Sequence, residues 1–453
     1  MQNLSLQIRQ NQRIKKSQEE NQIAEDEEYF AQLSHKSIVN IENDHIIFDS
    51  INELLSEDND TRYQSLLSLM ELSNHFSNMI LRSFTRDHFS ILYQYLQFDE
   101  TRSFVLTILV NFSKKSLYTP PDNIFQILTS ILQNFCDDDS DVDFSLVIIG
   151  NLINRGKDYA LKAIQFHLIE ILSKIPNLSH RILKLKIWIF SLIFLYENFE
   201  IEDQILSFLM TDEILNSNKI SIYRELINCF NNSIKWSQKS INIVKSSNIF
   251  ELSIQILLSC KEKAISSSLS FYSTCVRIPL IENICFIPSL FILLSKNEEE
   301  DFIYEDCIDV LIDVIEYKQS FSHILLISLN EVGLNSLLSM KSFSVKTKFL
   351  SLIEKIMQNC PTKIYLVNPN ELFCFLFEMI ESSQEKTLLL AAQIICLIVG
   401  LNSDCEWSRS FLMNLSSHDV FSILDQSSLI ETHQGFSEMI EMLASCVQNT
   451  ETS

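Results

Sequence analysis

The sequence predicts an all-α fold, a right-handed solenoid of stacked helical repeats. Three observations predict it: chain-breaking residues are scarce, apolar side chains keep helical spacing along most of the chain, and one helix type returns at a nearly constant interval. The 453 residues are 46% hydrophobic and 21% charged but include only five glycines and seven prolines. So few glycines and prolines cannot punctuate a many-stranded sheet or form phosphate-binding loops. The composition therefore favours helices.

The first 40 residues differ from the rest and predict a mostly disordered tail. Basic side chains come first, and acidic ones follow up to Glu28. Such a charged segment lacks the apolar surface that would stabilise a core. The basic side chains are Arg9, Arg13, Lys15 and Lys16.

The remainder of the chain has the pattern of a helical-repeat protein. From Ile46 onward the apolar residues keep helical spacing, and one helix type returns after a short polar break about every 42 residues, the interval of armadillo and HEAT repeats. Each repeat supplies two or three helices that cannot bury their apolar faces alone, so neighbouring repeats must stack. We expect about eight to ten such units over residues 41–447, followed by a polar C-terminal tail at residues 448–453.

Charge, hydropathy and cysteine usage restrict the partners and the compartment. The formal net charge is −23, which favours basic partners and argues against direct nucleic-acid binding. The longest apolar run, Thr387–Leu401, is too short to cross a bilayer, so we expect no membrane insertion. The eleven cysteines form no C-x-x-C pair and read as reduced, which predicts a location in the cytoplasm and nucleus.

No pattern of catalysis, metal binding or cofactor binding is found. The nine histidines include no pair at the spacing of a helical zinc site, and five scattered glycines exclude nucleotide-binding loops. The acidic run Asp137–Asp143 fails as a calcium loop, because Val142 and Ile148 replace the required Gly and Glu. We therefore expect a protein that is not an enzyme and that needs no cofactor or metal.

Several segments resemble the armadillo repeats of the importin-α family. Ser145–Ile175, Leu106–Lys115 and Lys186–Leu195 are similar to the repeat helix that ends near an Asn and is followed by a polar turn. Phe48–Leu72 resembles the family's entry unit, and Leu4–Arg13 resembles the start of the segment by which importin-α binds importin-β. These similarities occur in the family's order.

The resemblance implies a nuclear import adaptor. In that family a concave groove holds an extended lysine-rich peptide, with Asn side chains on the peptide backbone and Trp side chains as walls between lysine stems. Carried over by position, the peptide-binding residues are Asn111, Asn151, Asn231 and Trp188. The resemblance also implies that an importin-β-like receptor is bound by Arg9, Arg13, Lys15 and Lys16.

Four positions depart from the family's pattern and leave open whether lysine-rich signals bind. Thr107 and Val147 stand where the family has Trp, and Leu192 stands where it has Asn. Arg155 replaces an expected acidic residue, and we expect it to repel a lysine at the most selective pocket.

Alternatives to peptide and receptor binding also stay open. The Asn side chains could be ordinary polar residues of exposed helix faces, and Trp188 could be core packing instead of a groove wall. The basic tail could bind a receptor, act as an autoinhibitor, or do neither. The rival function is therefore an armadillo or HEAT scaffold that assembles a protein complex and has no transport role.

Overall fold

The computed structural model describes residues 44–418, with gaps at 135–138, 178, 197–200, 260–261, 283, 297–298, 339–340, 383, 401–405, and also residues 420, 424 and 441. Every regular element in these residues is a helix, which confirms the predicted all-α fold. The tails at residues 1–40 and 448–453 lie outside the described residues. The chain divides into two compact units, Met1–Ser233 and Ile234–Ser453.

Unit 1 is built from short and long helices in alternation. Its helices are α2 (Asp44–Glu53), α3 (Asn59–Ser83), α4 (Arg86–Tyr95), α5 (Asp99–Ser113), α6 (Ile124–Gln133), α7 (Asp139–Ile153), α8 (Lys157–Gln165), α9 (Leu168–Lys174), α10 (His180–Phe194), α11 (Glu202–Leu209), α12 (Asp212–Leu215) and α13 (Ile220–Ser233).

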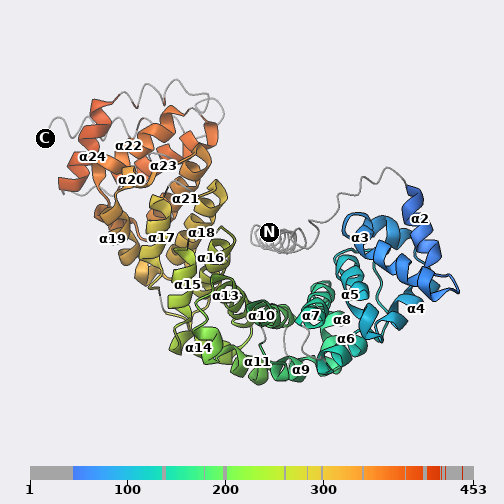
Figure 1. Cartoon of the computed structure of the whole chain (residues 1–453). Coiled ribbons are helices and arrows are strands. Elements are labelled where there is room, and N and C mark those ends of the chain that lie inside the picture. Colours follow the sequence, from blue (N-terminus) through green and yellow to red (C-terminus); the bar gives the residue numbers. More distant parts are fainter. Residues whose placement is uncertain are drawn as a thin grey trace. The chain divides into compact units, whose positions relative to one another are not determined.

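Two layers of helices make up unit 1. Helices α3, α5, α7, α10 and α13 each contact the next in this order, and Figure 1 shows α5, α7 and α10 following one another. We call these five helices the long-helix layer of unit 1. The shorter helices form the second layer, in which α9 contacts α6 and α11. The long helices carry most of the core, because nearly every side chain from Val142 to Ile153 on α7 is buried.

Side chains at the helix ends explain where the helices of unit 1 start. Asp58 caps α3 by accepting a hydrogen bond from the Thr61 N–H at 2.9 Å, and Ser179 caps α10 in the same way. Such caps satisfy backbone donors that have no partner within the helix. Helices α8 and α9 are separated at His167, whose φ of 57° is left-handed and cannot continue a helix.

Unit 2 repeats the same plan. Its elements are α14 (Gln238–Ser246), α15 (Ile249–Leu257), α16 (Glu262–Arg277), α17 (Ile287–Ser295), α18 (Asp301–Tyr317), η1 (Gln319–Phe321), α19 (Ser322–Val332), α20 (Leu334–Leu338), α21 (Phe343–Asn359), η2 (Pro361–Leu366), α22 (Pro369–Glu381), α23 (Glu385–Gly400) and α24 (Glu406–Ser417). Helices α16, α18, α21 and α23 contact one another in sequence and form the long-helix layer of unit 2.

The repeat interval is visible in the long helices. Successive long helices end at Ser113, Ile153 and Phe194 in unit 1 and at Arg277, Tyr317 and Asn359 in unit 2. These steps of about 40 residues, with contacts mainly between neighbouring repeats, are those of an armadillo-like or HEAT-like solenoid. The predicted repeat architecture is therefore confirmed.

A tyrosine on a long helix fastens the preceding loop in both units. The Tyr223 hydroxyl donates to the Leu215 carbonyl at 3.1 Å and accepts from the Asn218 N–H at 3.0 Å. Tyr304 makes the same two bonds, at the same sequence offsets, to Lys296 and Glu299. Buried backbone groups need hydrogen-bond partners, and in both repeats a tyrosine hydroxyl supplies them for the preceding loop.

Candidate functional site

Two of the predicted asparagines occupy matched places in the long-helix layer of unit 1. Asn111 on α5 donates from Nδ2 to the Ser73 hydroxyl at 2.9 Å, and Asn151 on α7 donates to the Ser113 hydroxyl at 2.9 Å. Each serine lies 38 residues earlier, on the preceding long helix. The asparagines are only 7% and 6% exposed. They therefore fasten successive repeats together, whatever else they bind.

On α13 the equivalent bond is made by Asn232. Its Nδ2 donates to the Ser191 hydroxyl at 3.1 Å and to the Ser191 carbonyl at 3.0 Å. Asn231, the residue predicted from the sequence, is the adjacent buried side chain. On α10 the corresponding residue is Leu192, which is also buried, so this long helix has no asparagine at the matched place. In the sequence, Asn232 could be found only from its place next to Asn231 and 41 residues after Ser191.

The hydrogen bonds of Asn111 limit what it can offer a ligand. A second bond joins its Nδ2 to Oδ1 of Asn74 at 2.8 Å, so both amide hydrogens are used within the chain. The Oδ1 atom remains as an acceptor. Asn111 can therefore accept a hydrogen bond from the backbone N–H of a peptide but has no further hydrogen to donate.

Trp188 on α10 is packed against α7 and is half-buried. A Cβ atom at Gly150 would lie 1.8 Å from the Trp188 ring, so the indole can take this place only because Gly150 has no side chain. Gly150 directly precedes Asn151. The packing role considered from the sequence is therefore present, and a role of the half-buried Trp188 as a groove wall stays a prediction.

Arg155 forms a clamp at the end of a helix, a role that the sequence did not predict, and its expected repulsion of a ligand lysine stays a prediction. Its guanidinium donates to the carbonyl oxygens of Ser113 at 2.7 Å and Tyr118 at 2.6 Å, and also to that of Lys115. It lies 5.6 Å from the centre of the Tyr118 ring. These carbonyls follow the end of α5, where the helix dipole is negative. Burial lowers the pKa of Arg155.

The same kind of clamp recurs in other repeats. The Tyr196 hydroxyl donates to the Ile153 carbonyl, which ends α7, at 3.3 Å. In unit 2 the Lys318 ammonium donates to the carbonyls of Ile278 and Pro279, just beyond the end of α16, at 3.0 and 3.1 Å. A polar group after one long helix therefore satisfies the exposed carbonyls at the end of the preceding one.

Two buried carboxylates on the long helices of unit 1 are paired with arginines. Asp143 on α7 accepts a 2.7 Å bond from Arg181 of α10. Glu225 and Arg224 on α13 form a 2.7 Å pair in which both side chains are less than 10% exposed. A lysine-rich peptide would have to displace an arginine from each carboxylate.

The positions where the importin-α family has further tryptophans carry no aromatic wall. Val147 is buried in α7, and Thr107 turns its hydroxyl to the Ser103 carbonyl at 2.8 Å. Of positions 107, 147 and 188, only the last has a tryptophan, Trp188 on α10, and α10 lies between the helices of Asn151 and Asn232.

The long-helix layer of unit 2 is connected by charged groups instead of amides. Asp313 on α18 accepts bonds from Arg277 at 2.9 Å and from Ser273 at 2.7 Å, and Lys348 of α21 lies 2.6 Å from Asp309. Burial raises the pKa of Asp313, and Arg277 partly offsets this. Further contacts of this kind are Lys355 with Glu316 at 2.9 Å and Ser344 with Glu305 at 2.5 Å.

Neither a metal-ligand cluster nor a membrane-spanning helix is found in the described part of the chain. No three His, Cys, Asp or Glu side chains there gather as metal ligands would. Among the same residues, no helix combines the length and the apolar character needed to cross a bilayer. The predicted receptor-binding residues Arg9, Arg13, Lys15 and Lys16 lie outside the described residues.

Comparison with known proteins shows the fold. No family model matches the sequence, and no curated protein matches it. The solved structure of an engineered protein aligns with a TM-score of 0.60 and 13% identity over 89% of this chain and 99% of its own. A designed armadillo repeat protein in complex with the peptide (KR)4 aligns over 50% of this chain and 98% of its own, with 13% identity and a TM-score of 0.41. By its fold, the chain is an armadillo-like or HEAT-like helical-repeat protein, as its helix order, its repeat interval and the first of these two alignments show.

Proposed function

We propose that this chain is a non-enzymatic scaffold that binds an extended segment of a partner protein along the long-helix layer of unit 1. The observation that carries the proposal is the placement of Asn111, Asn151 and Trp188 on three consecutive long helices. An extended peptide presents backbone groups at regular intervals, which side chains repeated once per helix pair can follow.

The side chains of this layer suggest how such a segment is held. Oδ1 of Asn111 accepts a backbone N–H, and the accessible part of Trp188 covers the aliphatic part of a ligand side chain. Thr107 on α5 and Val147 on α7 add no aromatic wall to the layer. The layer therefore suits a segment read mainly through its backbone.

The resemblance to importin-α favours a specific form of this function, a nuclear import adaptor. In that form the layer takes a lysine-rich nuclear-localisation peptide, and the basic residues of the tail bind an importin-β-like receptor. The protein then works in both cytoplasm and nucleus. The segments Leu4–Arg13 and Phe48–Leu72 support this form, and the net charge of −23 would steer a cationic peptide towards the protein.

A second form, a scaffold that assembles a complex without transport, is favoured by the ion pairs of unit 1. Asp143 is held by Arg181, and Glu225 is held by Arg224. Because these carboxylates are buried and paired, the layer offers a lysine little that an uncharged side chain would lack.

Peptide selection tests the scaffold function itself. Peptides selected from a random display library on the full chain should include a group whose affinity falls about tenfold in Trp188→Ala, because a wall contact near the centre of the site is lost. Tyr317→Ala, which removes an exposed aromatic ring from unit 2, is the matched control and should change nothing. If no selected peptide depends on Trp188, the proposed site is wrong.

Fluorescence anisotropy decides between the two forms. A labelled lysine-rich localisation peptide is titrated with the full chain and with the chain lacking residues 1–40. Saturable binding that weakens with salt and is lost in Trp188→Ala supports the import adaptor. Absence of binding in both chains, with selected uncharged peptides still bound, supports the scaffold without transport.

A further inference from the structure

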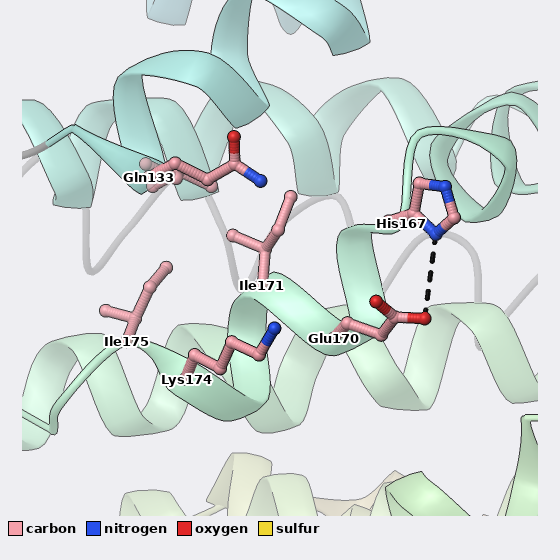
Figure 2. Close-up of a pocket in the computed structure, with 7 residues that line it drawn as sticks. Gln133, His167, Glu170, Ile171, Lys174 and Ile175 are labelled. Atoms are coloured by element: carbon pink, nitrogen blue, oxygen red, sulfur yellow. Dashed lines mark ion pairs between the residues drawn. The ribbon is translucent and has the colours of Figure 1, made fainter.

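A cavity of about 370 Å³ lies on the short-helix layer of unit 1, away from the proposed peptide site. It is formed by the C-terminal end of α6 and by α9, and Figure 2 shows the side chains around it. Its floor is aliphatic and its rim is polar. The floor consists of Leu132, Ile171 and Ile175, and the rim of Gln133, His167, Glu170 and Lys174.

The cavity lies in the most basic stretch of the described chain. Between Arg155 and Lys186 there are seven basic and only two acidic side chains, although the whole chain has a net charge of −23. Two acidic side chains lie among them: Asp158 is in the first turn of α8, and Glu170 at the rim faces His167, with 3.6 Å between Oε1 and Nδ1 (Figure 2).

Lys174 supplies the positive charge at the rim. Its side chain is exposed, and it forms no ion pair or hydrogen bond with any other residue in the part of the chain that the structure describes. A lysine of this kind beside an apolar floor can bind a carboxylate while the neighbouring side chain of the ligand is buried.

We propose that this cavity binds a partner protein through an apolar side chain that stands next to an acidic residue. The apolar side chain fills the space over Ile171, and the adjacent carboxylate pairs with Lys174. Buried apolar anchors with a polar rim are the common pattern of protein–protein recognition. The residues that form the cavity come from α6, from α9 and from the two residues that flank α9, and none of them belongs to the long-helix layer.

The chemistry of the cavity favours a protein segment over a nucleic acid. Its floor has aliphatic side chains and no aromatic ring on which a base could stack. The rest of the chain carries a large negative charge, which disfavours a long polyanion but tolerates a short acidic segment at the exposed Lys174.

Selection of peptides from a random display library on the full chain tests the proposal. We expect one group of peptides with an apolar residue beside Asp or Glu, bound about tenfold more weakly by Lys174→Glu and by Gln133→Glu. Both changes place a negative charge at the exposed rim, so the fold should be unaffected, which circular dichroism checks. Lys245→Glu, the same charge reversal at an exposed position of α14, is the matched control and should bind like the unmodified chain.

The Trp188→Ala variant separates this proposal from the proposed function. Peptides of the cavity should bind Trp188→Ala as they bind the unmodified chain, whereas peptides of the long-helix layer should not. The proposal is overturned if no acidic-apolar group is selected, if its binding does not respond to Lys174→Glu, or if it depends on Trp188. Binding of labelled single-stranded RNA that is lost in Lys174→Glu would overturn it in favour of a nucleic-acid site.

Discussion

The two units join their long helices with different sets of contacts. In unit 1, neutral amides span the layer, as in the bond from Asn151 to Ser113, beside the ion pair of Asp143 with Arg181. In unit 2, the equivalent layer is spanned by charged groups, as in Lys348 with Asp309 and Arg277 with Asp313. The difference shows that stacked repeats need polar partners about 40 residues apart, and that these partners can be hydrogen-bonded amides or ion pairs. It also means that salt and pH should act differently on the two units.

The largest effect should come from the close approach of α7 and α10 in unit 1. In Gly150→Ala the new Cβ would overlap the Trp188 ring, and we expect a loss of about 1–3 kcal/mol in the free energy of unfolding. Gly400→Ala in unit 2 is the matched control, because its Cβ would meet no atom within 4 Å. Alanine should there be neutral or stabilise by up to about 1 kcal/mol. Urea unfolding measures both, and equal effects would show that the packing of Trp188 is not tight.

The helix-end clamps should give the next largest effect, in both units. Arg155→Met leaves the carbonyls at the end of α5 without their charged donor and should cost about 2–3 kcal/mol. Lys318→Met removes two bonds at the end of α16 and should cost about 1–2 kcal/mol. Native-state hydrogen exchange should show faster exchange around the loop that follows α5 in the first variant only. A larger loss from Lys318→Met would contradict the ranking.

Double-mutant cycles test the difference between amides and ion pairs directly. The coupling between Asn151 and Ser113 should be about 1 kcal/mol and should not change with salt, since neither group is charged. The coupling between Lys348 and Asp309, which are about one third exposed, should be about 0.2–1 kcal/mol and should fall as NaCl is raised. Equal salt dependence of the two cycles would remove the contrast between the units.

The smallest effect on stability is expected from two buried lysines, one in each unit. Burial lowers the pKa of Lys186 in unit 1 and of Lys341 in unit 2 to about 8, from an ordinary value of 10.5. Between these values the unfolded chain binds more protons than the folded chain, so the free energy of unfolding should rise as the pH rises from about 8 to 10.5. Lys186→Met and Lys341→Met should each remove part of this rise, measured by urea unfolding at several pH values. An unchanged slope in both variants would show that these lysines stay fully charged in the folded state.

Much of the fold could be predicted because it depends on local pattern and interval. Helical spacing around residues such as Leu66 and Leu67 and a return interval of about 42 residues were sufficient for an all-α repeat architecture. The same interval predicted that Asn111 and Asn151 hold matched places, and their hydrogen bonds to Ser73 and Ser113 agree with this. Whether either residue binds a peptide stays a prediction.

The site could be predicted less well, because each side chain acts on a residue about 40 positions away. From the sequence, Arg155 is expected to repel a ligand lysine, which stays a prediction, and its bonds to the carbonyls at the end of α5 could not be foreseen because they depend on stacking. The need for glycine at position 150 cannot be predicted from the sequence, because it arises only from the Trp188 ring that packs there. Asn232 and Asn231 are adjacent, and only the rotation of α13 against α10 selects the one that meets Ser191.

The sequence by itself determined that this chain is helical, repetitive, acidic overall and basic between Arg155 and Lys186, because composition and interval are properties of the chain alone. Only the tertiary structure decided which polar groups face one another across repeats. That choice depends on the rotation and offset of each helix against the next, which the summed packing of the layer sets. Asp143 therefore holds Arg181 in place of a ligand, while Lys174 is left at the rim of an apolar cavity.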